Sequence, residues 1–361
     1  MRRFFTLSWF IVCTTLIAVW TFSPPPPAWI DRLYTGGFYA AVASLLVPLT
    51  GGVELPVTVL LLGVLGLGLA LRLVLEKRAR GWRVPLRWLR RGVVTLVTIY
   101  ALFIVMWGAN YARTPLETRL AFSNEVKPDT LEHLAFAEVL SSVIRHDHAA
   151  AANWSTDLAA GQASIKRVVE QLEGRNVTLP RFVKRTPPGF LLFTGQATGL
   201  MVPWTLEAYV DRALPYPYRL ATALHETAHV AGYSSEAEAD FIAGIAGLTA
   251  DNASVRYSTA LTFFARSAPR NLLPERYQAI VNSLPERFTR DTDALGRAYE
   301  RYRAPDSVGR LQTRFYDGYL RSQRVSAGVS DYDRAITLLL AAKQDDVLEF
   351  RGEEVSLHVP D

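Results

Sequence analysis

Uncharged apolar runs dominate the first 110 residues of the chain. They cover residues 4–22, 55–75 and 92–109, and Arg72 is the single charge among them. At about 1.5 Å per residue, each run is long enough for a helix that crosses the roughly 30 Å hydrocarbon core of a membrane. The first run follows Arg2 and Arg3 and ends at four prolines, not at a small-residue cleavage site. We therefore expect three transmembrane helices, the first of them an uncleaved anchor.

The stretch 34–52 is also apolar, but it is interrupted by glycines and a proline. Between Glu76 and Arg91, seven of the eight charged residues are basic, a pattern typical of a cytoplasmic loop. With three spans, the N-terminus and this loop both lie in the cytoplasm, and everything after residue 110 lies outside the plasma (inner) membrane. A fourth span would place the basic loop outside, so we interpret 34–52 as an interfacial or re-entrant segment.

The pattern changes after residue 111, where polar and apolar positions alternate as in a globular domain. Amphipathic periodicity predicts helices over 128–143, 155–172, 218–231, 235–248, 255–265, 274–282, 285–303, 307–323 and 331–342. Short apolar runs bounded by glycine and proline predict strands at 189–195, 199–203 and 206–210. We therefore divide the chain into a membrane domain, 1–111, and an extracytoplasmic domain, 112–361, that is mainly α within the α+β class.

The positive charge of the chain does not indicate a nucleic-acid partner. The 361 residues carry a formal net charge of +5, and the loop between Glu76 and Arg91 alone contributes +6. The rest of the chain is therefore close to neutral, so the expected partners are a lipid bilayer and a peptide or protein substrate. The lone cysteine, Cys13, excludes an intrachain disulfide and a cysteine-based metal site.

A His-Glu-x-x-His motif lies on the helix predicted at 218–231. His225 and His229 are four residues apart, so both imidazoles lie on one helical face and can bind one zinc ion. Glu226, next to the first histidine, can serve as the base toward a water that the zinc activates. A buried carboxylate between two histidines on an otherwise small and apolar helix is costly without a metal or partner.

A third protein ligand is expected where the chain returns after Gly232. The following segment, Glu236-Ala237-Glu238-Ala239-Asp240, resembles the Glu-x-x-Ala-Asp sequence of gluzincin metallopeptidases. This resemblance implies Glu236 as the third ligand and Asp240 as an acceptor for a histidine N–H. Glu238 is the alternative ligand, although Ser235-x-x-Glu238 also matches a capping box. Ser235 stands where a metzincin would need histidine or aspartate.

Two further features complete the expected catalytic site. An oxyanion needs a stabiliser besides the metal, and Tyr233 and Tyr209 are the nearest candidates, although tyrosines in the core are more common. The strand-like stretch 200–210 can provide an edge that pairs with an extended peptide.

Pieces spread along the chain resemble an uncharacterised bacterial membrane family, the domain of unknown function 3810. They are residues 107–115, 194–197, 207–209, 225–241 and 316–320. The resemblance implies three N-terminal spans and a zincin-like outer domain, and it adds no substrate. The expected function is a membrane-anchored zinc metallopeptidase, and the alternative is a non-catalytic zinc-binding sensor or envelope-assembly scaffold.

Overall fold

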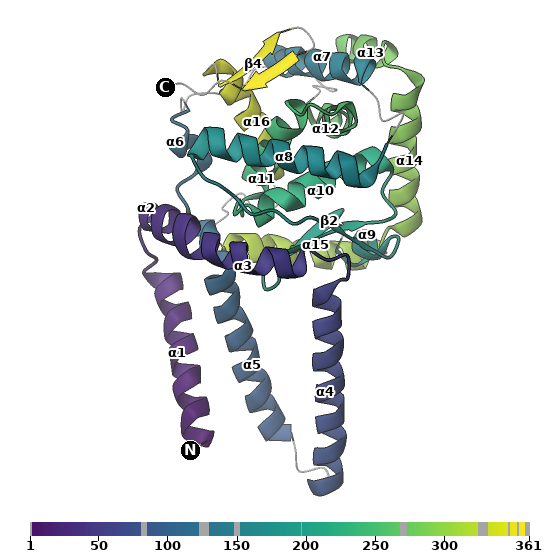
Figure 1. The fold of residues 1–361 in the computed structure, drawn as a ribbon. Coiled ribbons are helices and arrows are strands. Elements are labelled where there is room, and N and C mark those ends of the chain that lie inside the picture. Colours follow the sequence, from purple (N-terminus) through teal and green to yellow (C-terminus); the bar gives the residue numbers. More distant parts are fainter. Residues whose placement is uncertain are drawn as a thin grey trace.

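The computed structural model describes residues 2–357 except 81–84, 123–129, 148–151, 196, 268–272, 324–330, 346 and 352–353. About 74% of the described residues are helical. Figure 1 shows two parts: long helices that extend from one side of the molecule, called the leg here, and a larger helical body above them. The start of the predicted helix 128–143 lies outside the described residues.

The leg consists of α1 (Arg2–Phe22), α4 (Val57–Arg80) and α5 (Pro85–Met106). Within α4 and α5, Val57–Glu76 and Trp88–Met106 are long and apolar enough to span a membrane, and α1 contains the shorter apolar stretch Leu7–Phe22. The indole of Trp9 in α1 donates to the Thr98 hydroxyl of α5 at 3.0 Å. These apolar helices indicate a membrane anchor, and α4 and α5 match two of the three predicted runs, while the first run forms the shorter apolar stretch of α1.

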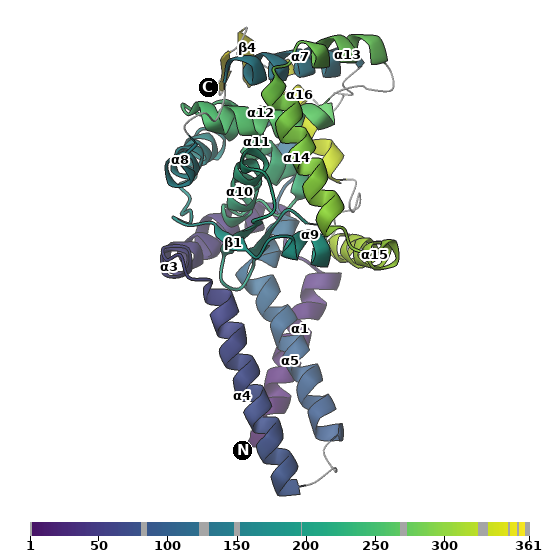
Figure 2. The same ribbon diagram turned by 90° about the vertical axis from the view of Figure 1, so that its right-hand side faces the viewer.

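Residues 27–50, called the belt here, lie across the end of the leg next to the body (Figures 1 and 2). The belt comprises α2 (Pro27–Trp29), the π-helix η1 (Ile30–Tyr39) and α3 (Ala40–Thr50). By length and composition it could also span a membrane. It packs on the body instead, because the Tyr39 hydroxyl donates to the Val230 carbonyl at 2.7 Å and Thr50 donates to Thr205. This arrangement fits the interfacial segment that the charge pattern favours.

The body follows a short 3₁₀ turn, η2 (Gly108–Ala112), and surrounds a central helical hairpin. Its helices are α6 (Leu116–Arg119), α7 (Thr130–His146), α8 (Trp154–Glu173), α9 (Phe190–Gly195), α10 (Tyr216–Val230), α11 (Glu236–Leu248), α12 (Ala253–Ser267), α13 (Pro274–Asn282), α14 (Glu286–Tyr302), α15 (Asp306–Ser322) and α16 (Asp331–Gln344). Nine of them match the predicted helices, with ends that differ by a few residues.

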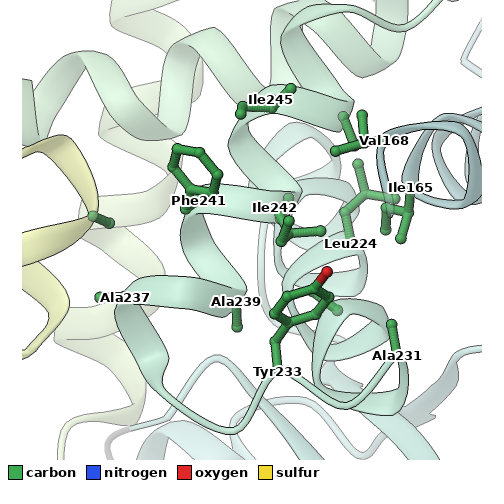
Figure 3. Close-up of a cluster of buried hydrophobic side chains, with 14 of the residues drawn as sticks. Ile165, Val168, Leu224, Ala231, Tyr233, Ala237, Ala239, Phe241, Ile242 and Ile245 are labelled. Atoms are coloured by element: carbon green, nitrogen blue, oxygen red, sulfur yellow. The ribbon is translucent and has the colours of Figure 1, made fainter. Parts of the chain in front are cut away.

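The hairpin of α10 and α11 is the centre of the core. Figure 3 shows Leu224 of α10 against Ile165 and Val168 of α8, and Phe241 and Ile242 of α11 in the same cluster. Every residue of α11 is buried. Gly161 allows α8 to approach α10 closely, since a Cβ there would lie 2.5 Å from a methyl group of Leu224.

A three-stranded sheet lies beside α10, with strand order β1-β3-β2. β1 (Lys184–Thr186) pairs with β3 (Glu207–Asp211) in parallel, and β2 (Gly199–Val202) pairs with β3 in antiparallel register. β2 is therefore an edge of this sheet, whereas β3, the second half of the stretch 200–210 that was predicted as an edge, is the central strand. β4 (Leu348–Arg351) and β5 (Glu354–Leu357) form a separate hairpin.

The strand predicted at 189–195 is wrong, because these residues form helix α9. Asp211, at the end of β3, accepts hydrogen bonds from the backbone amides of Gly189, Leu191 and Leu192. A carboxylate at a helix N-terminus satisfies amides that have no partner within the helix. β1, β4 and β5 were not predicted, because three or four residues carry too little periodicity.

Candidate metal centre

His225, His229 and Glu236 meet between α10 and α11. Their possible ligand atoms all lie within 4.8 Å of one another. Oε2 of Glu236 is 3.1 Å from Nε2 of His225 and 3.4 Å from Nε2 of His229. Zinc ligands at about 2.0–2.1 Å in a tetrahedron lie roughly 3.4 Å apart. The three side chains therefore have the donor set and the spacing of a zinc site.

The other ring nitrogens of the two histidines have acceptors of their own. Nδ1 of His225 lies 2.7 Å from Oδ1 of Asp240, and Nδ1 of His229 lies 2.6 Å from the backbone carbonyl of Tyr233. These acceptors favour the tautomer with the proton on Nδ1. Both Nε2 atoms can then point a lone pair toward a metal, which is the usual arrangement of metal-binding histidines.

Asp240 is itself fixed by a cation. Its Oδ2 accepts from Nη1 of Arg266 on α12 at 2.7 Å, so the chain Arg266, Asp240, His225 crosses three helices. Burial lowers the pKa of His225, but the Asp240 and Glu236 carboxylates outweigh it and hold this pKa well above its usual range. Burial raises the pKa of Glu236, but His229 and His225 hold it well below its usual range. The cluster is therefore strongly coupled by charge.

Glu226 is buried next to the two histidines, on the side of the sheet. Burial raises its pKa to about 7, because the carboxylate is removed from water. Gly199 at the start of β2 lies against it: a Cβ on this glycine would come within 2.7 Å of Cγ of Glu226 and of Cγ2 of Thr222. The edge strand therefore approaches the candidate base because it lacks a side chain at this position.

The alternative ligand, Glu238, does not reach the histidines. Its Oε1 accepts from the Leu116 amide at 2.9 Å, and its Oε2 pairs with Nη2 of Arg119 at 2.9 Å. Ser235 caps α11, since its hydroxyl accepts from the Glu238 amide. The carboxylate of Glu238 instead binds the first amide and the last side chain of α6. Glu236 is therefore the carboxylate that the hairpin brings to the two histidines.

Neither candidate oxyanion stabiliser lies at the centre. Tyr233 is fully buried, and Figure 3 shows its ring inside the hydrophobic cluster. The guanidinium carbons of Arg113, Arg119 and Arg175 lie 5.3–5.8 Å from the centre of that ring. The Tyr209 hydroxyl donates to Oε2 of Glu207 at 3.0 Å. Both tyrosines therefore serve packing and positioning, and the suggested catalytic role for them is withdrawn.

The turn between the two metal-centre helices is held by the membrane-proximal part of the chain. Gly232 has φ +97°, which a residue with a side chain rarely adopts. Nη1 of Arg113 donates to the Gly232 carbonyl, and Trp107 donates to the His229 carbonyl at 3.2 Å. The Trp107 ring also meets the His229 ring edge-on, with centroids 6.0 Å apart.

The sequence did not identify Trp107, Gly199 or Arg266 as parts of this centre. Trp107 does lie in one of the pieces that carry the family resemblance, 107–115, which was the available signal. Gly199 and Arg266 gave no local signal, because each reaches the site only through tertiary packing.

A family model covers residues 34–340, which is most of the chain and includes all the residues of this centre. The protein therefore belongs to the family described as "Protein of unknown function (DUF3810)". No curated protein and no solved structure shows a significant match to the chain.

Proposed function

We propose that this member of DUF3810 is a membrane-anchored zinc metallopeptidase with a zincin-like extracytoplasmic body. His225, His229 and Glu236 would hold the zinc ion, and Glu226 would be the general base. The substrates would be proteins or peptides at the outer face of the plasma membrane. The seven basic residues between Glu76 and Arg91 favour the cytoplasmic side for the far end of the leg.

The convergence of three metal-ligating atoms, with the other face of each imidazole already occupied, carries the proposal. Glu236 Oε2 lies within 3.4 Å of both Nε2 atoms, and Asp240 and the Tyr233 carbonyl hold the two Nδ1 atoms. When bound, zinc would supply a Lewis acid that polarises a carbonyl and acidifies a water. Two imidazoles and one carboxylate make up the candidate donor set, and this combination favours zinc over magnesium or calcium.

Glu226 is suited to the proton transfers of peptide hydrolysis. Its pKa of about 7 in the metal-free site lets it take up a proton from water and return it near neutral pH. A nearby cation would lower this pKa and favour the ionised base before reaction. The carboxylate would then deliver the proton to the leaving amine.

The edge strand β2 would align the substrate. β2 pairs with β3 on one side only within the described sheet, and Gly199 brings its first residue against Glu226. An extended peptide added to this edge would form backbone hydrogen bonds and pass the candidate base. The exposed Leu200 would contact side chains of such a peptide.

The attachment of α10, the helix that carries the two histidines, to the anchor favours a second candidate function. This candidate is a non-catalytic zinc sensor or scaffold. Trp107 and Tyr39 both donate to backbone carbonyls at the C-terminal end of α10. Zinc binding could therefore change how the body sits on the belt without any hydrolysis.

Cleavage assays on the full chain in nanodiscs separate the two candidates. The probes are fluorescein-labelled casein and a peptide tethered to the outer leaflet by an acyl chain. We expect Glu226→Gln to keep its zinc and to lose cleavage by about 10²–10⁴-fold, the usual contribution of a general base. Glu300→Gln, an exposed position on α14, is the matched control and should cleave normally. Equal cleavage by wild type and Glu226→Gln would contradict the proposal, and zinc binding without cleavage of either probe would favour the scaffold.

A further inference from the structure

Helix α15 has an apolar face that is open to the surroundings. Val308, Leu311 and Phe315 are spaced by three and four residues, so they share one side of the helix, and Phe315 is 72% exposed. Arg310 lies on a different side, about 100° or more around the helix from each of these three residues. A helix with an exposed apolar side and a basic polar side is typical of segments that lie in the plane of a membrane interface.

α15 lies at the height where the leg meets the body. Figure 2 shows α3 and α15 nearly end-on, at the same level and on opposite sides of the leg. Beyond the end of α15, Nε2 of Gln323 donates to the Tyr100 hydroxyl of α5 at 3.2 Å. In its middle, Gln312 donates to the backbone carbonyls of Phe193 and Thr194. Both contacts fix the helix beside the membrane anchor.

The neighbouring helix α9 adds exposed aromatic residues to this region. Phe190 and Phe193 are each about half exposed. Between β2 and β3, Trp204 donates its indole N–H to the Ile99 carbonyl of α5 and packs near the Phe103 ring. This part of the body therefore reaches down to the spanning window of α5, Trp88–Met106.

We propose that α15 is an interfacial membrane-binding helix, which lies on the outer leaflet of the phospholipid bilayer together with Phe190 and Phe193 of α9. Its 17 residues form a rod about 25 Å long that would insert its apolar side among the upper acyl chains. The occupant of this surface is lipid because the surface continues the lipid-covered helices of the leg. The inference does not depend on zinc or on peptidase activity. It means that the body contacts the bilayer surface directly, in addition to being linked to the helices of the leg.

Fluorescence quenching in full-length protein tests this placement. Single cysteines at Leu311 and at Phe315, in a Cys13→Ser background, carry a bimane label and are reconstituted into nanodiscs with acyl-brominated phosphatidylcholine. We expect a loss of emission at both positions, comparable to that of a label at the exposed Leu65 of α4. The matched control, Arg310→Cys on the polar side, should be quenched by aqueous iodide and not by brominated lipid.

Two results would overturn the inference. If labels at Leu311 and Phe315 are quenched by iodide as strongly as the label at Arg310, the apolar side faces water. If they are shielded from both quenchers, another protein surface covers them. The two positions are tested in separate chains, so each gives an independent result.

Discussion

The indole nitrogen of Trp107 donates a hydrogen bond to the backbone carbonyl of His229 across 3.2 Å. Trp107 directly follows helix α5 of the anchor, and His229 is a candidate zinc ligand on α10. The residue after an apolar helix suited to span a membrane therefore contacts the backbone of a residue of the candidate metal centre. The Tyr39 hydroxyl adds a second bond, to the neighbouring Val230 carbonyl.

Removing this indole N–H should weaken zinc binding as well as the fold. We expect Trp107→Phe to lower the free energy of unfolding by about 1 kcal/mol, the usual worth of a hydrogen bond, and to weaken zinc affinity measurably. Trp204→Phe is the matched control, because its indole also joins the body to the anchor, but by a bond to the Ile99 carbonyl of α5 and not to a histidine. Chelator competition should show weaker zinc binding in Trp107→Phe and not in Trp204→Phe. Unchanged zinc affinity in Trp107→Phe would show that this contact with the anchor does not affect the candidate metal centre.

The two glutamates of the α11 first turn should have opposite effects when neutralised. Glu236→Gln removes a carboxylate from the candidate ligands, so bound zinc should fall below stoichiometry. Glu238→Gln should keep its zinc and lose about 1–3 kcal/mol of stability, because the buried Leu116 amide and Arg119 lose a charged partner. Zinc content and thermal unfolding distinguish the two, and the reverse pattern would make Glu238 the ligand.

A methyl group on Gly199 should impair the base without removing the metal. Because a Cβ there would fall 2.7 Å from Cγ of Glu226, the carboxylate must move. We expect Gly199→Ala to retain zinc and to lose cleavage of the tethered peptide by at least about tenfold. Gly296→Ala, where the added Cβ meets nothing within 4 Å, is the control. Full activity in Gly199→Ala would show that β2 does not set the position of Glu226.

Zinc binding should weaken as pH falls, and the change should begin above the usual histidine pKa. Asp240 and Glu236 raise the pKa of His225 in the metal-free protein, so zinc must displace a proton there even near neutral pH. The raised pKa stabilises the metal-free fold below the pKa of an unfolded histidine, and this stabilisation is lost as pH rises through the folded value. Acid therefore favours the metal-free form.

Asp240→Asn checks the origin of that pH dependence. Without the carboxylate the pKa of His225 should fall, so zinc affinity should vary less between about pH 6 and about pH 8. Affinity at the upper pH should drop by about 10–100-fold, as for other acceptors of a ligating histidine. Asp251→Asn, at an exposed position after α11, is the control. Competition titrations that give parallel pH curves for Asp240→Asn and wild type would contradict this explanation.

The helical hairpin of α10 and α11, which brings Glu236 to the two histidines, could be predicted because the residues that define it are close in sequence. His225 and His229 are one helical turn apart, and Gly232 and Ser235 define a short turn that returns Glu236 to them. The choice between Glu236 and Glu238 could not be made from periodicity alone. In the structure, Arg119 and the Leu116 amide, which belong to a distant segment, bind Glu238, and Glu236 is the carboxylate that faces the two histidines.

Features that depend on long-range contacts were missed or misread. The apolar run at 189–195 has strand composition, yet Asp211 caps its amides and it becomes α9. Trp107 is 122 residues from His229 in sequence, so no window along the chain joins them. The membrane runs were easier, because a span needs only length and the absence of charge.

Metal analysis of the purified full-length protein tests the central claim most directly. We predict about one zinc per chain in wild type and in Glu226→Gln, since the base is not a ligand. His229→Ala should lose the zinc, while circular dichroism shows that the helical body remains folded. Equal zinc in wild type and in folded His229→Ala would contradict the assignment of His225, His229 and Glu236 as a zinc site.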